Sequence, residues 1–476
     1  ERRVFWFSTS LPKRDPLPRP TVKQLTPFTM GLSRGSILTF ELQNRQTINS
    51  SGLVAAQLTG RMHIVMISAE YPPRWGGMGS TVYHLSRHLA QNGHHVSVIT
   101  RSNKKKAHLD EQGIYVHEVS WAKIPMYFTR SFAYHSINTL NSIASDRPID
   151  VIHLHLPMIS LSENQMMECT SIAPTVASLH GSWLGERDGL ITARNVGEPA
   201  VFRNPNDLAI LLTAKHYAKY EKSSASLAHV SVSNSNATQV DFIERYKMPP
   251  DWNCKTIHWG VDTDLFSPLE ENESTKRARE KVRDRFGFNH DDPVLLAVGR
   301  LAARKGYSTL LRAFRIVIKE IPDAKLLMVG RGGMKKNLYK YAAKWGFKPS
   351  IRIESSMDFD ELSTVYNSCD LTVFPSYYEG QGLIPLESMS SGVPVIATNY
   401  GPIPEMVDDE VGSLFELGDE VDLAGKIIAE LSQWDRLMEK GRKGRERVVD
   451  RFSFRNSCLE FEGLYEDLVN GSNDLS

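Results

Sequence analysis

The sequence predicts an α/β protein of two tandem domains, each built on a doubly wound parallel sheet. Short apolar runs recur along the chain, as strands buried on both faces require, and a loop and a helical pattern follow most of them. This order starts afresh near the middle of the chain, after a charged helical segment at residues 270–285. Two such domains are expected to face each other across a cleft where ligands bind at the carboxyl ends of the strands.

The first domain is predicted over residues 61–265. An apolar run at residues 64–67 forms its first strand, and a glycine-rich loop containing Gly76 and Gly77 follows. The next helix carries one apolar face and ends at Asn92-Gly93, which supplies a left-handed residue. Further strand signals stand at residues 96–99, 151–156, 176–179 and 230–232. The order strand, loop, helix, strand is the crossover that parallel pairing requires.

The second domain is predicted over residues 266–450, and residues 451–476 are expected to form a closing helix. Strand signals in the second domain stand at residues 294–298, 324–330, 371–375 and 395–398. Each of these apolar runs is as short as a buried parallel strand.

Residues 1–60 are expected to be a poorly ordered extension. They are poor in acidic groups, carry a Pro-rich basic stretch at residues 11–20 and show no sustained periodicity. Three interpretations stay open: a reading-frame artefact, an organelle transit segment or a disordered tail. None of them places function there, and Met62 opens the first strand signal.

The composition excludes some classes of protein. The 476 residues carry a formal net charge of +1, which gives no electrostatic reason to expect a nucleic-acid partner. The four cysteines lie far apart, with neither zinc-ribbon spacing nor disulfide density, so a reduced, cytoplasmic compartment is the simplest interpretation. No apolar run approaches the roughly 20 residues that span a bilayer.

The most informative motif follows the strand that ends at Phe374. A glycine loop leads into a helix that begins near Leu383, and free N–H groups at such a start form an anion site suited to a diphosphate. Glu379 and Glu387 flank this start, and carboxylates suit sugar and ribose hydroxyls because each accepts two hydrogen bonds. The alternative is an ordinary loop and helix whose glutamates only complement the helix dipole.

A second motif places cations at the end of another buried strand. Arg300, Arg304 and Lys305 follow the apolar run at residues 294–298. Across a cleft from an anion-binding helix start, such cations would neutralise a leaving diphosphate. A solvated basic loop is the alternative, and the position at a strand end favours binding.

Together these motifs resemble the family 4 retaining glycosyltransferases of the GT-B fold, which has two Rossmann-like domains. The resemblance extends from about residue 62 to about residue 470. It rests on four segments, namely the Gly76-Gly77 loop and residues 260–266, 299–306 and 379–395.

The resemblance implies a role for each matching residue. Arg300 and Lys305 would contact the donor diphosphate, Glu379 would bind hydroxyls of the transferred sugar, and Glu387 would bind the donor ribose. His180 would lie near the sugar and the acceptor. The implied catalytic set is His180, Arg300, Lys305 and Glu379. Further donor contacts are implied at the backbone of Gly77, Gly382, Leu383 and Ile384. The final helix is implied to cross back onto the first domain.

The sequence departs from the family pattern in three segments. Trp259 stands where the family usually has asparagine, Gln381 stands where phenylalanine is frequent, and Ser390-Ser391 replaces a common Ala-Cys pair. None of these changes removes a charged contact. Gln381 and its neighbours are expected to alter the preference for the donor sugar.

The implied reaction moves a hexose-type sugar from a UDP- or GDP-linked donor, with retained configuration and without a metal or other cofactor. No DxD-type motif stands at a convincing strand end, so cations and a helix start would stabilise the diphosphate. The departing phosphate oxygen would take the acceptor proton, and no side-chain nucleophile is then needed, unlike in retaining glycosidases.

Other functions are weighed against transfer. His153, His155 and His180 suggest a metal site, which the lack of nearby carboxylate or cysteine ligands disfavours. A nucleotide-sugar epimerase of the same fold needs an acid and a base near the sugar, and only Glu379 is an obvious candidate. A non-catalytic sugar-nucleotide-binding protein would need the same pocket.

The acceptor stays undecided among a glycan, a lipid and a small molecule. Lys104 to Lys106, Lys123 and the aromatic-basic stretch at residues 127–134 fit peripheral contact with an anionic membrane surface. A solvated loop and an ordinary amphipathic helix are the favoured alternative. Residues 181–205 are expected to face the cleft and to select the acceptor.

Overall fold

The computed structural model describes residues 60–473, apart from residues 74–75, 103–105, 203, 271 and 356. The extension expected at residues 1–60 lies outside the described residues except for Gly60, and so do Lys104 and Lys105 of the basic loop. Within the described residues, no helix is both long and apolar enough to cross a membrane.

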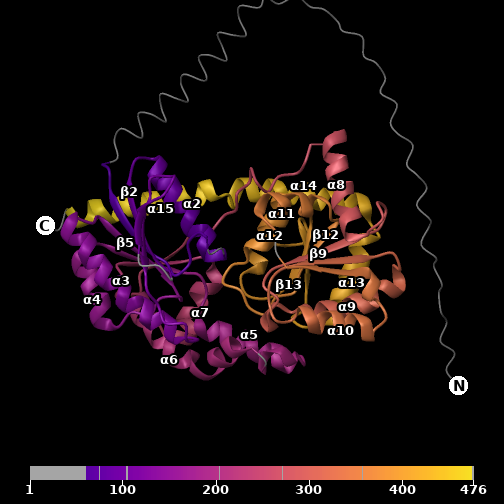
Figure 1. The fold of residues 1–476 in the computed structure, drawn as a ribbon, viewed down its shortest axis with the longest axis horizontal. Coiled ribbons are helices and arrows are strands. Elements are labelled where there is room, and N and C mark those ends of the chain that lie inside the picture. The colour runs from indigo at the N-terminus through magenta and orange to yellow at the C-terminus, as the bar shows by residue number, and fades with distance from the viewer. Residues whose placement is uncertain are drawn as a thin grey trace, which may run out of the picture. The chain divides into compact units, whose positions relative to one another are not determined.

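The first sheet has eight strands in the order β3-β4-β2-β1-β5-β6-β7-β8, and all of its neighbours pair in parallel except β3 and β4. Its strands are β1 (His63–Ile67), β2 (His95–Arg101), β3 (Lys106–Leu109), β4 (Tyr115–Val119), β5 (Val151–Leu156), β6 (Thr175–Leu179), β7 (Val230–Ser233) and β8 (Cys254–Thr256). Its helices are α2 (Gly77–Gln91), α3 (Tyr127–Asp146), α4 (Glu163–Ile172), α5 (Trp183–Asn195), α6 (Pro205–Leu227) and α7 (Asn236–Tyr246), with the short 3-10 helix η1 (Pro199–Phe202). Figure 1 shows α3 and α4 together on one side of this sheet.

The second sheet has six parallel strands in the order β11-β10-β9-β12-β13-β14. Its strands are β9 (Val294–Val298), β10 (Lys325–Val329), β11 (Ile351–Glu354), β12 (Leu371–Phe374), β13 (Val395–Thr398) and β14 (Gly412–Phe415). Its helices are α8 (Glu273–Phe286), α9 (Tyr307–Glu320), α10 (Lys335–Lys344), α11 (Phe359–Asn367), α12 (Leu383–Ser390), α13 (Glu420–Leu431) and α14 (Trp434–Arg451). Three 3-10 helices complete it: η2 (Ala303–Lys305), η3 (Lys348–Ser350) and η4 (Ile403–Glu405).

Both sheets reverse their strand order next to their first strand. The chain leaves β1 towards β2 and later returns to its other side with β5, and it leaves β9 towards β10 and returns with β12. A ligand crevice opens at the carboxyl ends of the strands at such a reversal. The fold is therefore the pair of doubly wound domains that the sequence predicted, and the two reversals locate the ends of β1, β5, β9 and β12 as the places to look for a site.

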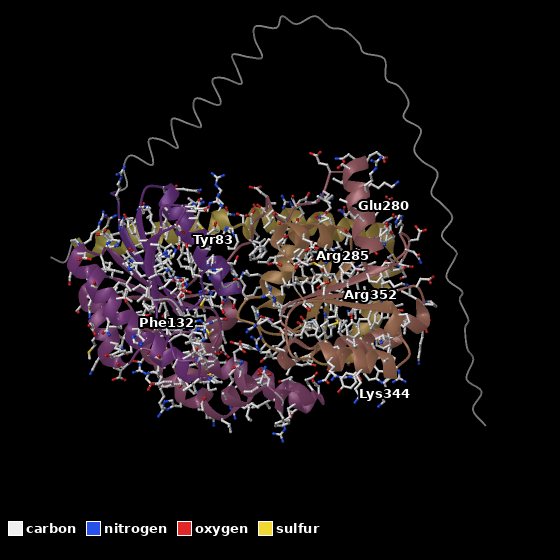
Figure 2. All side chains as sticks on the ribbon, viewed as in Figure 1. Tyr83, Phe132, Glu280, Arg285, Lys344 and Arg352 are labelled. Atoms are coloured by element: carbon white, nitrogen blue, oxygen red, sulfur yellow. The ribbon has the colours of Figure 1, made fainter. Side chains whose placement is uncertain are left out.

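Five strands were not predicted from the sequence, and all of them lie at or next to a sheet edge: β3, β4, β8, β11 and β14. The central strand β1 is buried at every position, whereas β3 is exposed at every position. Buried strands produce the apolar runs that sequence reasoning detects, and edge strands do not. Helices differ in burial as well: Figure 2 labels Phe132 of α3, which is buried inside the first domain, and Lys344 of α10, which is exposed at the periphery of the second.

The last helix, α15 (Phe454–Asn473), follows α14 but contacts the first domain. Its buried side chains Cys458, Phe461, Leu464 and Tyr465 share a core cluster with β1 and β2. Glu462 of α15 contacts His88 at 3.0 Å and His94 at 2.9 Å, beside the end of α2. Figure 1 shows α15 lying alongside α2.

Candidate active site

The cations after β9 divide into two groups. Arg300 is exposed, and no ion pair engages it in the described part of the chain. Arg304 is buried and forms an ion pair with Glu186 of α5. Sequence reasoning placed Arg304 with Arg300 and Lys305 as a cation for phosphate, and this placement is wrong, because the guanidinium is occupied by a carboxylate of the first domain.

Lys305 and Glu379 form a mostly buried ion pair. Lys305 Nζ contacts Glu379 Oε1, and the two side chains are 12% and 14% exposed. Burial alone would raise the pKa of Glu379, but Lys305 and Arg304 hold that pKa below its ordinary value. Burial lowers the pKa of Lys305, and the charge of Glu379 opposes this effect. The carboxylate is therefore ionised and keeps free lone pairs for further hydrogen bonds.

The start of α12 offers unpaired N–H groups next to this ion pair. Gly382, at φ +95°, precedes the helix, and no side chain caps it. Leu383 and Ile384, which begin the helix, are partly exposed. Backbone N–H groups and the helix dipole at this end favour an anion.

The start of α2 faces the start of α12. Gly77 opens α2, no side chain caps this helix either, and a Cβ added to Gly77 would lie 3.9 Å from Leu383 Cδ1. Two positive helix ends, one from each domain, therefore converge on one region. Such an arrangement suits a ligand with more than one phosphate group.

Glu387 lines a pocket between the domains. Its Oε2 accepts a hydrogen bond from Tyr366 Oη at 2.9 Å, and burial raises the pKa of Glu387 to about 7. The pocket is lined by Ser80, Tyr83, His84, Val261, Asp262, Leu265, Phe266, Phe359, Leu383, Glu387 and Phe454. Aromatic walls with a few carboxylates suit a nucleoside, whose base is flat and whose ribose carries hydroxyl groups.

Three histidines follow one another from the first sheet towards the cleft. His153 contacts Ser178 Oγ and Tyr465 Oη, each at 2.6 Å. His155 Nδ1 lies 2.9 Å from His180 Nε2, so one of these two nitrogens carries the shared proton. Burial lowers the pKa of His153 and of His180 to about 3, and it holds the pKa of His155 well below its usual range.

All three rings are therefore neutral, and His153 is satisfied within the fold. No group of three or more histidine, cysteine, aspartate or glutamate side chains in the described part of the chain has the arrangement of a metal site.

Two departures from the family pattern lie in contact. The side chain of Gln381 accepts a hydrogen bond from Trp259 N at 2.9 Å and donates one to Trp259 O at 2.6 Å. The indole of Trp259 stacks on His180, with 5.6 Å between ring centroids, and on Phe461 at 4.5 Å. Gln381 thus binds the segment that joins the two domains. Its amide is not free to contact a donor sugar, contrary to the expectation that it tunes sugar preference.

Residues 181–205 mostly form α5 and η1, which pack against the second domain. Leu190, Ala193 and Val201 belong to the same core cluster as the apolar residues of β9 and α9. Glu198 accepts a hydrogen bond from Ser308 of α9. Sequence reasoning expected this stretch to face the cleft, but much of it is an arm that covers the second domain. Arg203 lies outside the described residues.

The chain thus has two facing doubly wound domains and two helix starts without side-chain caps. Glu379 precedes α12, and Glu387 lies within it. This combination defines the GT-B class of nucleotide-dependent enzymes. Residues 278–447 match the family Glycosyl transferases group 1, and residues 75–265 match Glycosyltransferase Family 4. The chain belongs to the family 4 glycosyltransferases, as the sequence motifs predicted.

Relatives cover most of the chain. An uncharacterized glycosyltransferase from Methanocaldococcus jannaschii is 26% identical over 411 residues, which are 85% of this chain and 98% of that protein. An N-acetyl-alpha-D-glucosaminyl L-malate synthase from Bacillus anthracis is 24% identical over 402 residues, covering 83% and 95%. The structure of a sucrose-phosphate synthase from Thermosynechococcus elongatus has a TM-score of 0.70 at 21% identity, covering 86% and 100%, and shows the same fold.

Proposed function

We propose that this glycosyltransferase moves a hexose-type sugar from a UDP- or GDP-linked donor to an acceptor hydroxyl, with retention and without a metal. The observation that carries the proposal is the Lys305–Glu379 ion pair beside the facing starts of α2 and α12. Here a carboxylate for sugar hydroxyls and positive charge for a diphosphate stand side by side.

Each candidate residue has a part in this reaction. The starts of α2 and α12, together with Arg300 and Lys305, bind the diphosphate and stabilise the charge that grows on its departing oxygen. Glu379 accepts hydrogen bonds from the sugar, and Glu387 accepts them from the ribose in the pocket beside it. His180, as a neutral ring, hydrogen-bonds the sugar or the acceptor.

The anomeric configuration is retained if the acceptor oxygen approaches the same face of the sugar from which the phosphate oxygen departs. The acceptor oxygen bonds to the anomeric carbon while the bond to the phosphate oxygen breaks, and the acceptor proton passes to that departing oxygen. Two cations and two helix starts supply the positive charge that a metal supplies in other enzymes, which supports the metal-free proposal.

The acceptor is a glycan, a lipid or a small molecule. The Bacillus anthracis relative is named for L-malate, which supports including small hydroxy acids among the candidates. Membrane contact is not part of the proposal. Tyr127 and Tyr134 of α3 are 51% and 60% exposed, but Arg130 between them donates to Ser160 O and lies over the Tyr220 ring, so its charge is turned inward. The four free cysteines support a cytoplasmic location.

The test combines thermal shift and product analysis of the full chain with a panel of UDP and GDP sugars, each with and without EDTA. One donor is expected to stabilise the protein and to be slowly hydrolysed or transferred in EDTA, with the anomeric configuration kept in the NMR spectrum of the product. An epimerised donor would point to the rival epimerase, and binding without turnover of any acceptor would point to a sensor. A strict requirement for a divalent metal would overturn the metal-free mechanism.

A further inference from the structure

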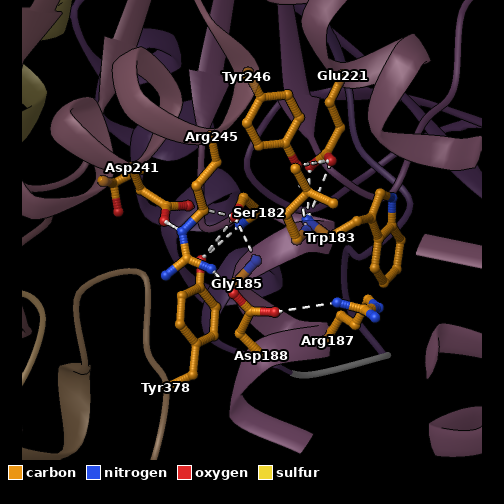
Figure 3. Close-up of polar contacts among 12 residues, drawn as sticks. Ser182, Trp183, Gly185, Arg187, Asp188, Glu221, Asp241, Arg245, Tyr246 and Tyr378 are labelled. Atoms are coloured by element: carbon orange, nitrogen blue, oxygen red, sulfur yellow. Dashed lines mark hydrogen bonds and ion pairs between the residues drawn. The ribbon is translucent and has the colours of Figure 1, made fainter. Parts of the chain in front are cut away.

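Tyr378, the residue just before Glu379, is inserted into the first domain. Its side chain is 7% exposed, and Figure 3 shows it beside Ser182 and Gly185, at the start of α5. Tyr378 Oη accepts a hydrogen bond from Ser182 N at 2.8 Å and donates one to Ser182 Oγ at 3.2 Å. A residue of the second domain thus satisfies a backbone group at a helix start of the first.

Two glycines of α5 make room for the Tyr378 ring. Gly185 and Gly189 lie four residues apart, so they share one face of the helix. A Cβ on Gly189 would lie 2.6 Å from Tyr378 Cβ, and a Cβ on Gly185 would lie closer still to the ring atoms. Real Cβ atoms essentially never show contacts under 3.0 Å. We call this face, with Ser182 at its end, the glycine slot.

The glycine slot is held from behind by polar contacts. Ser182 Oγ donates to Asp241 Oδ2 at 2.6 Å and accepts from Gly185 N at 2.9 Å. Asp241 pairs in turn with Arg245, as the dashed lines in Figure 3 show. Glu221 accepts two hydrogen bonds from Trp183 N, both at 3.1 Å. Because the first N–H groups of α5 have partners, this helix start serves as a socket for a side chain and not as an anion site.

The residue on the other side of Glu379 is also fixed by the first domain. Gly380 O accepts hydrogen bonds from Ser235 Oγ at 2.8 Å and from Thr238 Oγ1 at 2.9 Å. A Cβ on Gly380 would overlap the carbonyl group of His180. Glu379 is thus flanked on both sides by residues whose places are set in the first domain, while its own side chain pairs with Lys305 of the second domain.

We infer that Tyr378 is a positioning residue, and that its seating in the glycine slot sets the place of the Glu379 carboxylate. Contact between the two domains would then be coupled more strongly to recognition of the sugar part of the donor than to recognition of the nucleotide. The inference rests on the proposed role of Glu379 in sugar binding.

The deciding variant is Gly185→Ala, which adds one methyl group where the Tyr378 ring lies. Alanine in place of glycine otherwise favours a helix. The matched control is Gly425→Ala in α13, where an added Cβ meets nothing within 4 Å. We expect Gly185→Ala to lower kcat/KM for the nucleotide sugar by about 10²-fold, because displacing a reacting group by about 1 Å has an effect of that size. The binding of UDP or GDP without the sugar should weaken much less than the binding of the nucleotide sugar, because Glu387 and the start of α12 belong to the second domain and do not touch the substituted helix.

Two further variants keep the inference open to refutation. Tyr378→Phe fills the slot but loses both hydrogen bonds to Ser182. It should lower kcat/KM for the nucleotide sugar by a smaller factor than Gly185→Ala does, and it too should weaken nucleotide-sugar binding more than nucleotide binding. In a Tyr378→Ala background, Gly185→Ala should have almost no further effect, because the ring that it displaces is gone. Small-angle scattering without any nucleotide should show a larger radius of gyration for Gly185→Ala than for Gly425→Ala.

Wild-type scattering and turnover in Gly185→Ala would overturn the inference, as would additive losses in the double variant or equal weakening of nucleotide and nucleotide sugar. Failure of the proposed function gives a different result. In that case the wild-type protein binds and converts no nucleotide sugar, while the scattering of the two glycine variants still decides whether Tyr378 in the slot holds the domains together.

Discussion

The first and second domains form the two walls of the cleft, called the first wall and the second wall, and these walls carry different chemical groups. The second domain contributes charged groups, namely the exposed Arg300 and the Lys305–Glu379 pair. The first domain contributes a helix start and neutral rings, because burial lowers the pKa of His180 to about 3. Burial removes a charge unless an opposite charge lies nearby, and on the second wall Lys305 and Glu379 provide that opposite charge for each other. We therefore propose that the second wall supplies the charged side chains that neutralise phosphate, whereas the first wall adds the start of α2 and orients the sugar.

The largest effect should come from breaking the ion pair of the second wall. We expect Glu379→Ala to lower kcat/KM at least about 10³-fold, because the sugar hydroxyls lose the carboxylate that accepts their hydrogen bonds and Lys305 loses its ion-pair partner. The fold should survive with a lower melting temperature, since one mostly buried ammonium is left unpaired. Steady-state kinetics and thermal unfolding measure both effects. Glu379→Gln keeps the shape and should melt nearer to the wild type, and wild-type turnover in Glu379→Ala would refute the assigned role.

Removing the exposed cation should separate catalysis from stability. Arg300→Ala should lower kcat by about 10²-fold, as loss of one group that stabilises a developing negative charge does. Its unfolding free energy should change by less than about 0.5 kcal/mol, because Arg300 is exposed and has no ion pair in the described residues. Arg436→Ala, at an exposed position of α14, is the control and should change neither quantity. A large loss of stability in Arg300→Ala would show that Arg300 is structural.

The contact between the walls should matter more for stability than for turnover. Gln381→Leu leaves the buried N–H and C=O groups of Trp259 without partners, and we expect the free energy of unfolding to fall by about 2 kcal/mol. Turnover should fall less than about tenfold, and the ratio of kcat/KM between two donor sugars should stay constant. Denaturant unfolding and paired donor assays measure these quantities, with the exposed Gln433→Leu as control. A changed sugar ratio would restore the interpretation that Gln381 selects the donor.

The second wall was readable from the sequence, and much of the first was not. Arg300, Lys305, Glu379 and the start of α12 lie in two short motifs, each next to a strong strand signal, and strand ends in a doubly wound sheet point to a site. His180 instead stacks on Trp259, which in turn stacks on Phe461 of α15, and both partners are remote from His180 in sequence.

Pairings of this kind depend on tertiary packing, which leaves no local pattern. The same holds for Arg304, whose partner Glu186 lies in the other domain. It also holds for Tyr378, whose contacts with the glycine slot lie as far as 196 residues away in the sequence. The sequence does contain a pair of glycines four residues apart, Gly185 and Gly189, but no helix was predicted there, so nothing showed that the two glycines share one face.

The smallest expected effect is a pH dependence that separates the walls once more. Burial raises the pKa of Glu387 to about 7, so its ionised form, which accepts more hydrogen bonds from ribose, grows from about 10% at pH 6 to about 90% at pH 8. Donor KM should therefore fall by up to about tenfold over this range, and Glu387→Gln should abolish the slope. His180 should add no slope there, because it stays neutral above its pKa of about 3.

The two groups also affect stability with opposite signs. The contribution of Glu387 is present below its ordinary pKa and is lost as the pH rises through about 7, whereas that of His180 is present above its ordinary pKa and is lost as the pH falls towards 3. The pH dependence of the donor KM is measured by donor titrations of the wild type and of Glu387→Gln at pH 6, 7 and 8. If the donor KM of Glu387→Gln still fell with pH as in the wild type, the titrating group would be another residue of the cleft, and Glu387 would not be the group that binds the ribose.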